Sequence, residues 1–135
     1  MRRLVKACAA VTVAATLALG LTGCYAAEKT IDYSTSSVTL APGEALVVEF
    51  GEINRTVGDA WVITGEPDPA VLGPGGERSR YLGQDGETGA PSDVSYRFAP
   101  VGEGTTVIRF EYEFRGAVPA DADDQQTAEI TVTVR

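Results

Sequence analysis

The stretch that decides the fold is Thr106-Val107-Ile108-Arg109-Phe110-Glu111-Tyr112-Glu113-Phe114. From Ile108 onward every second residue is large and apolar, and the residues between them are charged. Because successive side chains of a β-strand point to opposite faces, this pattern predicts a strand with one buried and one solvent-exposed face. Two-faced strands of this kind are typical of antiparallel sheets.

The same two-residue alternation recurs through the rest of the chain. It indicates further strands near residues 38–40, 45–50, 60–64, 94–98 and 129–134, with weaker signals at 70–72 and 78–82. Segments rich in proline and glycine separate these strands, and no segment has a helical period. The sequence therefore predicts an all-β fold, an immunoglobulin-like β-sandwich of about seven to eight antiparallel strands. Its expected core consists of Leu46, Val48, Phe50, Trp61, Ile63, Tyr96, Phe98, Ile108, Phe110, Tyr112, Ile130, Val132 and Val134.

The amino-terminal segment has the features of a secretory signal peptide. Arg2, Arg3 and Lys6 precede an apolar run over residues 7–21, which is shorter than the roughly 20 residues that a membrane-spanning helix needs. The run ends in Leu21-Thr22-Gly23-Cys24, which resembles a bacterial lipobox. This resemblance implies cleavage before Cys24 and lipidation of its thiol. We therefore expect a removed signal peptide (1–23), a lipidated cysteine with a flexible tether (24–36) and a folded domain (37–135).

The charge of the chain limits its partners. Removing the three cationic residues of the signal peptide leaves 8 basic and 19 acidic residues, a net charge of about −11. Such a balance disfavours binding to nucleic acid or to an anionic lipid surface through electrostatics. The lipobox instead implies attachment through acyl chains, with an acidic domain lipid-anchored on the extracytoplasmic side of the cell membrane.

Several kinds of catalytic chemistry are excluded by composition. The chain has no histidine, and its two cysteines are Cys8, in the expected signal peptide, and the lipidated Cys24. Nucleophilic systems that depend on histidine or a free thiol, and zinc sites built from these residues, are therefore excluded. The acidic loop with Asp121, Asp123 and Asp124 lacks the glycine and the distant glutamate of an EF-hand, so it is read as a solvated loop. We expect no enzyme activity, no cofactor and no metal.

Three segments carry a family resemblance. Asn54-Arg55-Thr56-Val57-Gly58-Asp59-Ala60-Trp61 lies between two expected strands, a glycine-rich segment with Gly83, Gly86 and Gly89 precedes the strand at 94–98, and Arg115 follows the aromatic strand. In type and order these features resemble the chagasin-type family of cysteine protease inhibitors, whose members are immunoglobulin-like sandwiches. The resemblance covers roughly residues 37–135.

The resemblance implies a binding surface made of three loops. The family's first loop reads Asn-Pro-Thr-Thr-Gly and is matched by Asn54, Arg55, Thr56, Val57 and Gly58. The second loop is glycine-rich, as at Gly83, Gly86 and Gly89, and the third begins with Arg-Pro-Trp, where this chain has Arg115 followed by Gly116 and Ala117. In the family these loops fill the active-site cleft of papain-like proteases without a covalent step. The expected partner is thus a papain-like cysteine protease, bound by a monomer.

A second reading uses the same fold for a different purpose. An immunoglobulin-like lipoprotein without inhibitory activity is able to hold a basic partner or a cation through its acidic loops. The arrangement of the three loops distinguishes the two readings: convergence at one end with exposed apolar or backbone surface favours inhibition, and splayed loops favour the binding module.

Overall fold

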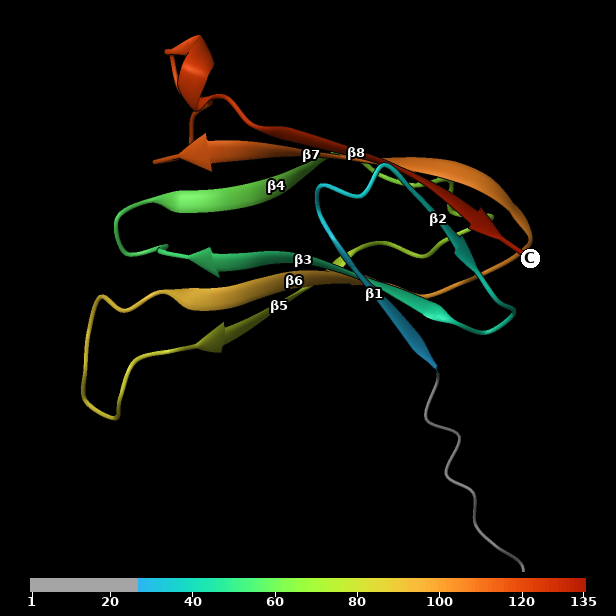
Figure 1. The fold of residues 1–135 in the computed structure, drawn as a ribbon, viewed down its shortest axis with the longest axis horizontal. Coiled ribbons are helices and arrows are strands. Elements are labelled where there is room, and N and C mark those ends of the chain that lie inside the picture. Colours follow the sequence, from blue (N-terminus) through green and yellow to red (C-terminus); the bar gives the residue numbers. More distant parts are fainter. Residues whose placement is uncertain (1–26) are drawn as a thin grey trace, which may run out of the picture.

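Two four-stranded β-sheets face each other in the computed structural model, which describes residues 27–135 (Figure 1). The first sheet has the order β1 (Glu28–Asp32), β3 (Ala45–Ile53), β6 (Ser92–Phe98), β5 (Gly76–Tyr81). The second has the order β2 (Ser37–Leu40), β8 (Thr127–Val134), β7 (Gly104–Phe114), β4 (Asp59–Gly65). The helical structure within residues 27–135 is one short 3₁₀ turn, η1 (Ala122–Asp124). The predicted all-β sandwich and its number of strands are confirmed.

The expectation that all strands pair antiparallel is wrong at two places. β1 pairs parallel with β3, and β2 pairs parallel with β8. Between β1 and β2 the chain crosses from the first sheet to the second, so two reversals give β3 the direction of β1 (Figure 1). β1 also lies within the segment expected to be a flexible tether, and the folded part therefore begins before residue 37. Its sequence, Glu28-Lys29-Thr30-Ile31-Asp32, is mostly exposed and lacks the alternation that marks the other strands.

Aromatic rings fill the centre of the sandwich. The ring centroid of Phe50 lies 4.9 Å from that of Trp61, 5.8 Å from that of Tyr96 and 4.8 Å from that of Phe110, so β3, β4, β6 and β7 meet at this point. Trp61 is 3% exposed, which confirms it as a core residue. The expected core residues are buried, except that Ile63 and Tyr112 are partly buried and pack against the core.

The less regular middle of the chain closes one side of the sandwich. The weak strand signal at residues 70–72 corresponds to a single bridge between Leu72 and Pro100, and Val71 and Leu72 are both buried. The signal at 78–82 corresponds to β5, whose residues are all exposed and which forms an edge of its sheet. Within residues 27–135, no helix is long and apolar enough to span a membrane.

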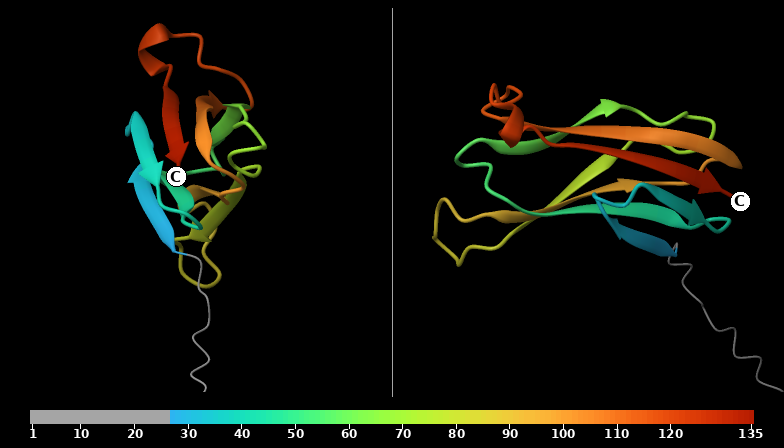
Figure 2. Two further views of the ribbon diagram at one scale, coloured as in Figure 1. Left: turned by 90° about the vertical axis from the view of Figure 1, so that its right-hand side faces the viewer. Right: turned by 45° about the horizontal axis from the view of Figure 1, so that its top comes forward.

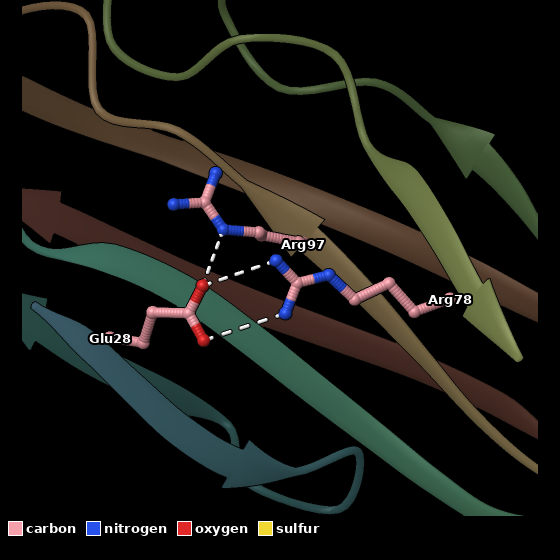
Figure 3. Close-up of polar contacts among 3 residues, drawn as sticks. All are labelled: Glu28, Arg78 and Arg97. Carbon is pink, nitrogen blue, oxygen red and sulfur yellow. Dashed lines mark hydrogen bonds and ion pairs between the residues drawn. The ribbon is translucent and has the colours of Figure 1, made fainter. Parts of the chain in front are cut away.

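A three-residue ion cluster fastens the outer face of the first sheet (Figure 3). The Glu28 carboxylate of β1 accepts hydrogen bonds from Arg97 Nε of β6 at 2.6 Å and from Arg78 Nη2 of β5 at 3.2 Å. These two guanidinium groups, Arg97 first, hold the pKa of Glu28 below its usual value. Because β1 and β5 are the outer strands of this sheet, the cluster connects its two edges.

Candidate functional site

Three connections converge at one end of the sandwich (Figures 1 and 2). Loop 1 (54–58) joins β3 to β4, loop 2 (82–91) joins β5 to β6, and loop 3 (115–126) joins β7 to β8. The strand registers require this convergence. Ser92 pairs with both Ile53 and Tyr81, and Asp59 pairs with Phe114, so the strand ends that flank the loops lie together in each sheet.

Asn54 organises loop 1 and connects it to loop 2. Its Oδ1 accepts a hydrogen bond from the Thr56 amide at 3.1 Å, and its carbonyl accepts from the amides of Val57 and Asp59. Its Nδ2 donates to the Gly89 carbonyl of loop 2 at 3.1 Å. An asparagine side chain that bonds the backbone two residues ahead stabilises a tight turn. The sequence-predicted residues Asn54 and Gly89 are thus brought into direct contact.

Gly58 and Arg115 connect loop 1 to loop 3. The Arg115 amide donates to the Gly58 carbonyl at 2.8 Å, and Arg115 Nε donates to the Val57 carbonyl at 3.4 Å. Gly58 has a φ of +112°, and a Cβ placed on it would lie 2.5 Å from Arg115 Cγ and 3.0 Å from the Arg115 amide nitrogen. Only glycine therefore satisfies both the backbone conformation and the close approach.

Loop 3 begins with a two-residue turn. Arg115 and Gly116 have φ values of 52° and 79°, and Phe114 exchanges backbone hydrogen bonds with Ala117 on the far side of the turn. Positive φ at both central residues is the pattern of a type I′ hairpin turn. Proline, which fixes φ near −65°, is incompatible with position 116 in this geometry. The third loop of this chain therefore begins with a tight turn, and its backbone geometry at Gly116 differs from that of a loop beginning Arg-Pro-Trp.

Loop 2 is built around a residue that sequence reasoning missed, Tyr81. Its hydroxyl donates to the Glu87 carbonyl at 2.8 Å and accepts from the Ala90 amide at 3.2 Å. A Cβ on Gly83 would lie 2.4 Å from Tyr81 Cε1, so Gly83 lets the chain pass over the ring. Gly86 and Gly89 have φ values of 81° and 85°, which glycine adopts at little cost. The signal in the sequence was an aromatic residue two positions before the first loop glycine.

In the acidic part of loop 3, the Asp121 carboxylate bonds to the loop's own backbone. Asp121 caps η1 by accepting from the Asp123 amide at 3.1 Å, and Gln125 Nε2 donates to the Pro119 carbonyl. In the part of the chain that the structure describes, no group of three or more acidic residues is arranged to hold a metal ion. A cavity of about 360 Å³ lies beside this loop, lined by Asp59, Tyr112, Phe114, Pro119, Asp123, Asp124 and Gln126.

Two tyrosines beside the loops have perturbed acidity. Tyr112 donates to Asp59 Oδ1 at 2.7 Å, and this bond, with burial, raises the pKa of Tyr112 to about 12. Burial, together with the negative charge of Glu77, raises the pKa of Tyr96 to about 12. Both hydroxyls are therefore neutral hydrogen-bond donors at physiological pH, which suits a structural role at the base of the loops.

Comparison with solved structures places this fold among known proteins. The cysteine protease inhibitor EhICP2 from Entamoeba histolytica aligns at 18% identity with a TM-score of 0.60, over 84% of this chain and 100% of that one. Amebosin aligns at 18% identity with a TM-score of 0.55, over 81% of this chain and 98% of that one. PbICP-C, solved in complex with falcipain-2, aligns at 18% identity with a TM-score of 0.51, over 80% of this chain and 89% of that one.

The chain has the fold of a chagasin-type protease inhibitor. The resemblance read from its loop motifs is therefore confirmed at the level of the fold. No protein-family model and no curated protein matches the sequence. The expected signal peptide and the lipidated Cys24 lie outside the described residues.

Proposed function

We propose that the protein inhibits papain-like cysteine proteases by occupying their active-site cleft with loops 1, 2 and 3. The proposal is supported by structural neighbours, one described as a cysteine protease inhibitor and one solved in complex with falcipain-2. In this mechanism loop 1 enters the cleft and loops 2 and 3 flank it. This proposed mechanism has no covalent step, so inhibition would depend on the fit of the loops and on exclusion of substrate.

The single observation that carries the proposal is the surface at the loop end. Among residues 27–135, five large hydrophobic side chains are exposed, and four of them lie in the three loops or at the strand ends beside them: Val57, Tyr81, Phe114 and Val118. Exposed apolar side chains that gather in one place mark an interaction surface, whereas scattered ones do not. The hydrogen bonds from loop 1 to both neighbouring loops hold this surface in one shape, which reduces the entropy lost on binding.

The second part of the proposal is that the inhibitor is a lipoprotein anchored to the extracytoplasmic side of the membrane through Cys24. Glu28 pairs with Ala45 at the start of β3, whereas loop 1 follows the end of β3, so the two sites lie at opposite ends of a nine-residue strand. Nine residues span about 30 Å in a β-strand. An anchor near residue 24 therefore leaves the loops facing away from the membrane. Loss of the protein from the membrane fraction on Cys24→Ser tests this part.

The inhibitory activity is tested by titrating papain with the chain from Tyr25 onward, which contains all eight strands. Val57→Arg should weaken inhibition at least about tenfold, equivalent to about 1.4 kcal/mol, because it places a charged side chain at the tip of loop 1. Val101→Arg makes the same change at the exposed valine outside the loop end and should leave inhibition unchanged. Thr56→Arg should abolish inhibition. The proposal fails for this protease class if the unmodified chain does not inhibit at micromolar concentration.

A second candidate function is the non-inhibitory binding of a basic partner. The observation that favours it is the cavity beside loop 3, which is lined by three carboxylates and two aromatic rings: Asp59, Asp123, Asp124, Tyr112 and Phe114. Carboxylates and an exposed ring together suit a lysine or arginine side chain. Binding of a polylysine peptide that is lost in an Asp123→Asn, Asp124→Asn double variant, without inhibition of papain, would support this function.

A further inference from the structure

Arg55 extends out of loop 1 to a strand of the first sheet. Its Nη2 lies 2.5 Å from Glu77 Oε1 on β5. Glu77 sits opposite Tyr96 in the β5–β6 register, and the Tyr96 hydroxyl lies 3.1 Å from Glu77 Oε2. The same hydroxyl donates to the Trp61 carbonyl on β4 at 2.7 Å. A continuous set of polar contacts therefore leads from loop 1 through both sheets.

We infer that Arg55 is a positioning residue, which fixes the conformation of loop 1 by pairing with Glu77 rather than by contacting the protease. The inference rests on the proposed function and specifies how its first loop is held. Asn54 and Gly58 secure the two ends of the loop through loops 2 and 3. The Arg55 pair adds a third attachment, which leaves Thr56 and Val57 as the part of loop 1 available to enter a cleft.

The environment of Glu77 makes this pair more effective than an average surface ion pair. An exposed pair gains little because two long side chains must be ordered to form it. The Glu77 side chain is 31% exposed, and its Oε2 lies 3.1 Å from the hydroxyl of Tyr96, a residue that is 7% exposed and fixed by the core. The single proton of this hydroxyl is shared between Glu77 and the nearer Trp61 carbonyl. Arg55 thus meets a partner whose freedom of movement is already reduced before the pair forms. The ordering of Arg55 is transmitted directly to the loop backbone.

Hydrogen exchange of the full chain tests the inference without any protease. The amides of Val57, Gly58 and Asp59 donate to carbonyls of Asn54 and Arg55 inside the loop, so their exchange rates report its order. Arg55→Met and Glu77→Gln should each raise these rates about two- to fivefold, the range expected for loss of a partly exposed ion pair. The double variant should match the single variants, because both remove the same contact.

A second ion pair on the same strand provides matched controls. Arg80 on β5 pairs with Asp93 on β6 and does not reach loop 1. Arg80→Met and Asp93→Asn should leave the exchange of Val57, Gly58 and Asp59 unchanged. The inference is overturned if Arg55→Met and Glu77→Gln also leave the rates unchanged, or if the control variants raise them equally.

Inhibition measurements separate positioning from contact. If Arg55 positions the loop, Arg55→Met and Glu77→Gln weaken inhibition of papain by the same factor, and the exchanged pair Arg55→Glu with Glu77→Arg recovers most of the loss. If Arg55 binds the protease, only Arg55→Met weakens inhibition and the exchanged pair does not recover it, which overturns the inference. Absence of papain inhibition by the unmodified chain would overturn the proposed function alone, since hydrogen exchange still decides the role of Arg55.

Discussion

Gly58→Ala is the substitution that most directly tests the junction of loops 1 and 3. The new Cβ would meet three atoms of Arg115: Cγ at 2.5 Å, the amide nitrogen at 3.0 Å and Cα at 3.2 Å. The Arg115 side chain is able to rotate away, but its backbone is held by the hydrogen bond from its amide to the Gly58 carbonyl. The substitution must therefore separate the two loops or strain them.

The cost has two parts. A non-glycine residue at a φ of +112° carries backbone strain of about 1–3 kcal/mol. Forcing a methyl group against the Arg115 backbone adds about 1–3 kcal/mol, as for other overpacked sites. We expect Gly58→Ala to lower the free energy of unfolding by about 2–6 kcal/mol, a large part of the 5–15 kcal/mol typical of a domain.

Urea unfolding followed by tryptophan fluorescence measures this cost, because Trp61 lies in the core three residues after Gly58. Gly86→Ala is the matched control: Gly86 also has a positive φ, of +81°, but a Cβ there would meet nothing within 4 Å. The Gly86→Ala variant should therefore lose only the free energy that the backbone strain costs. Equal losses in the two variants would refute the reasoning, since they would mean that Gly58 and Arg115 are not in contact in solution.

Three further predictions concern the scaffold. The lowered pKa of Glu28 means that its ion pairs with Arg97 and Arg78 stabilise the fold above about pH 4.5 and lose this effect as the pH falls through the folded-state pKa. The free energy of unfolding, measured in urea at about pH 7 and about pH 3, should therefore fall less in Glu28→Gln than in the unmodified chain. Because the pKa of Tyr96 is raised to about 12, stability should fall as the pH rises from about 10 to about 12, and an alkaline titration of Tyr96→Phe should lack part of this fall. Phe50→Ala should lower the free energy of unfolding by about 3–5 kcal/mol in the same urea assay, since four neighbouring rings lose their central contact.

Alternation predicted the fold because it directly reflects burial. Ile108 and Phe110 are 0% and 1% exposed. Arg109 between them is exposed and forms an ion pair with Glu129 on the neighbouring strand β8. Phe114 continues the pattern but is 40% exposed, because the strand ends there and the facing sheet no longer covers it. A period of two therefore identifies the face of a residue, and the length of the partner strands decides whether that face is covered.

The parallel pairing of β1 was not predictable from the same pattern. Its burial is almost uniform. It is held by its parallel ladder with β3 and by the contacts of Glu28 with Arg78 and Arg97, which lie 50 and 69 residues away in the chain. Such contacts leave no local periodicity. The order of the loops was predictable from their motifs, whereas the contacts between them were not. The pairing of Arg55 with Glu77 requires the register of β5 against β6, which no local motif encodes.

The parallel alignment of β1 with β3 also affects how the domain responds to force. β1 begins at the end of the sandwich farthest from the three loops and runs toward them alongside β3. A pull on the amino-terminal end of β1, opposed by a partner that grips the loops, draws the two strands past each other along their length. Their hydrogen bonds are then loaded together rather than broken one by one, and the Glu28 ion pairs oppose the same displacement. The fold is thus arranged to bear tension between its amino-terminal end and its loops.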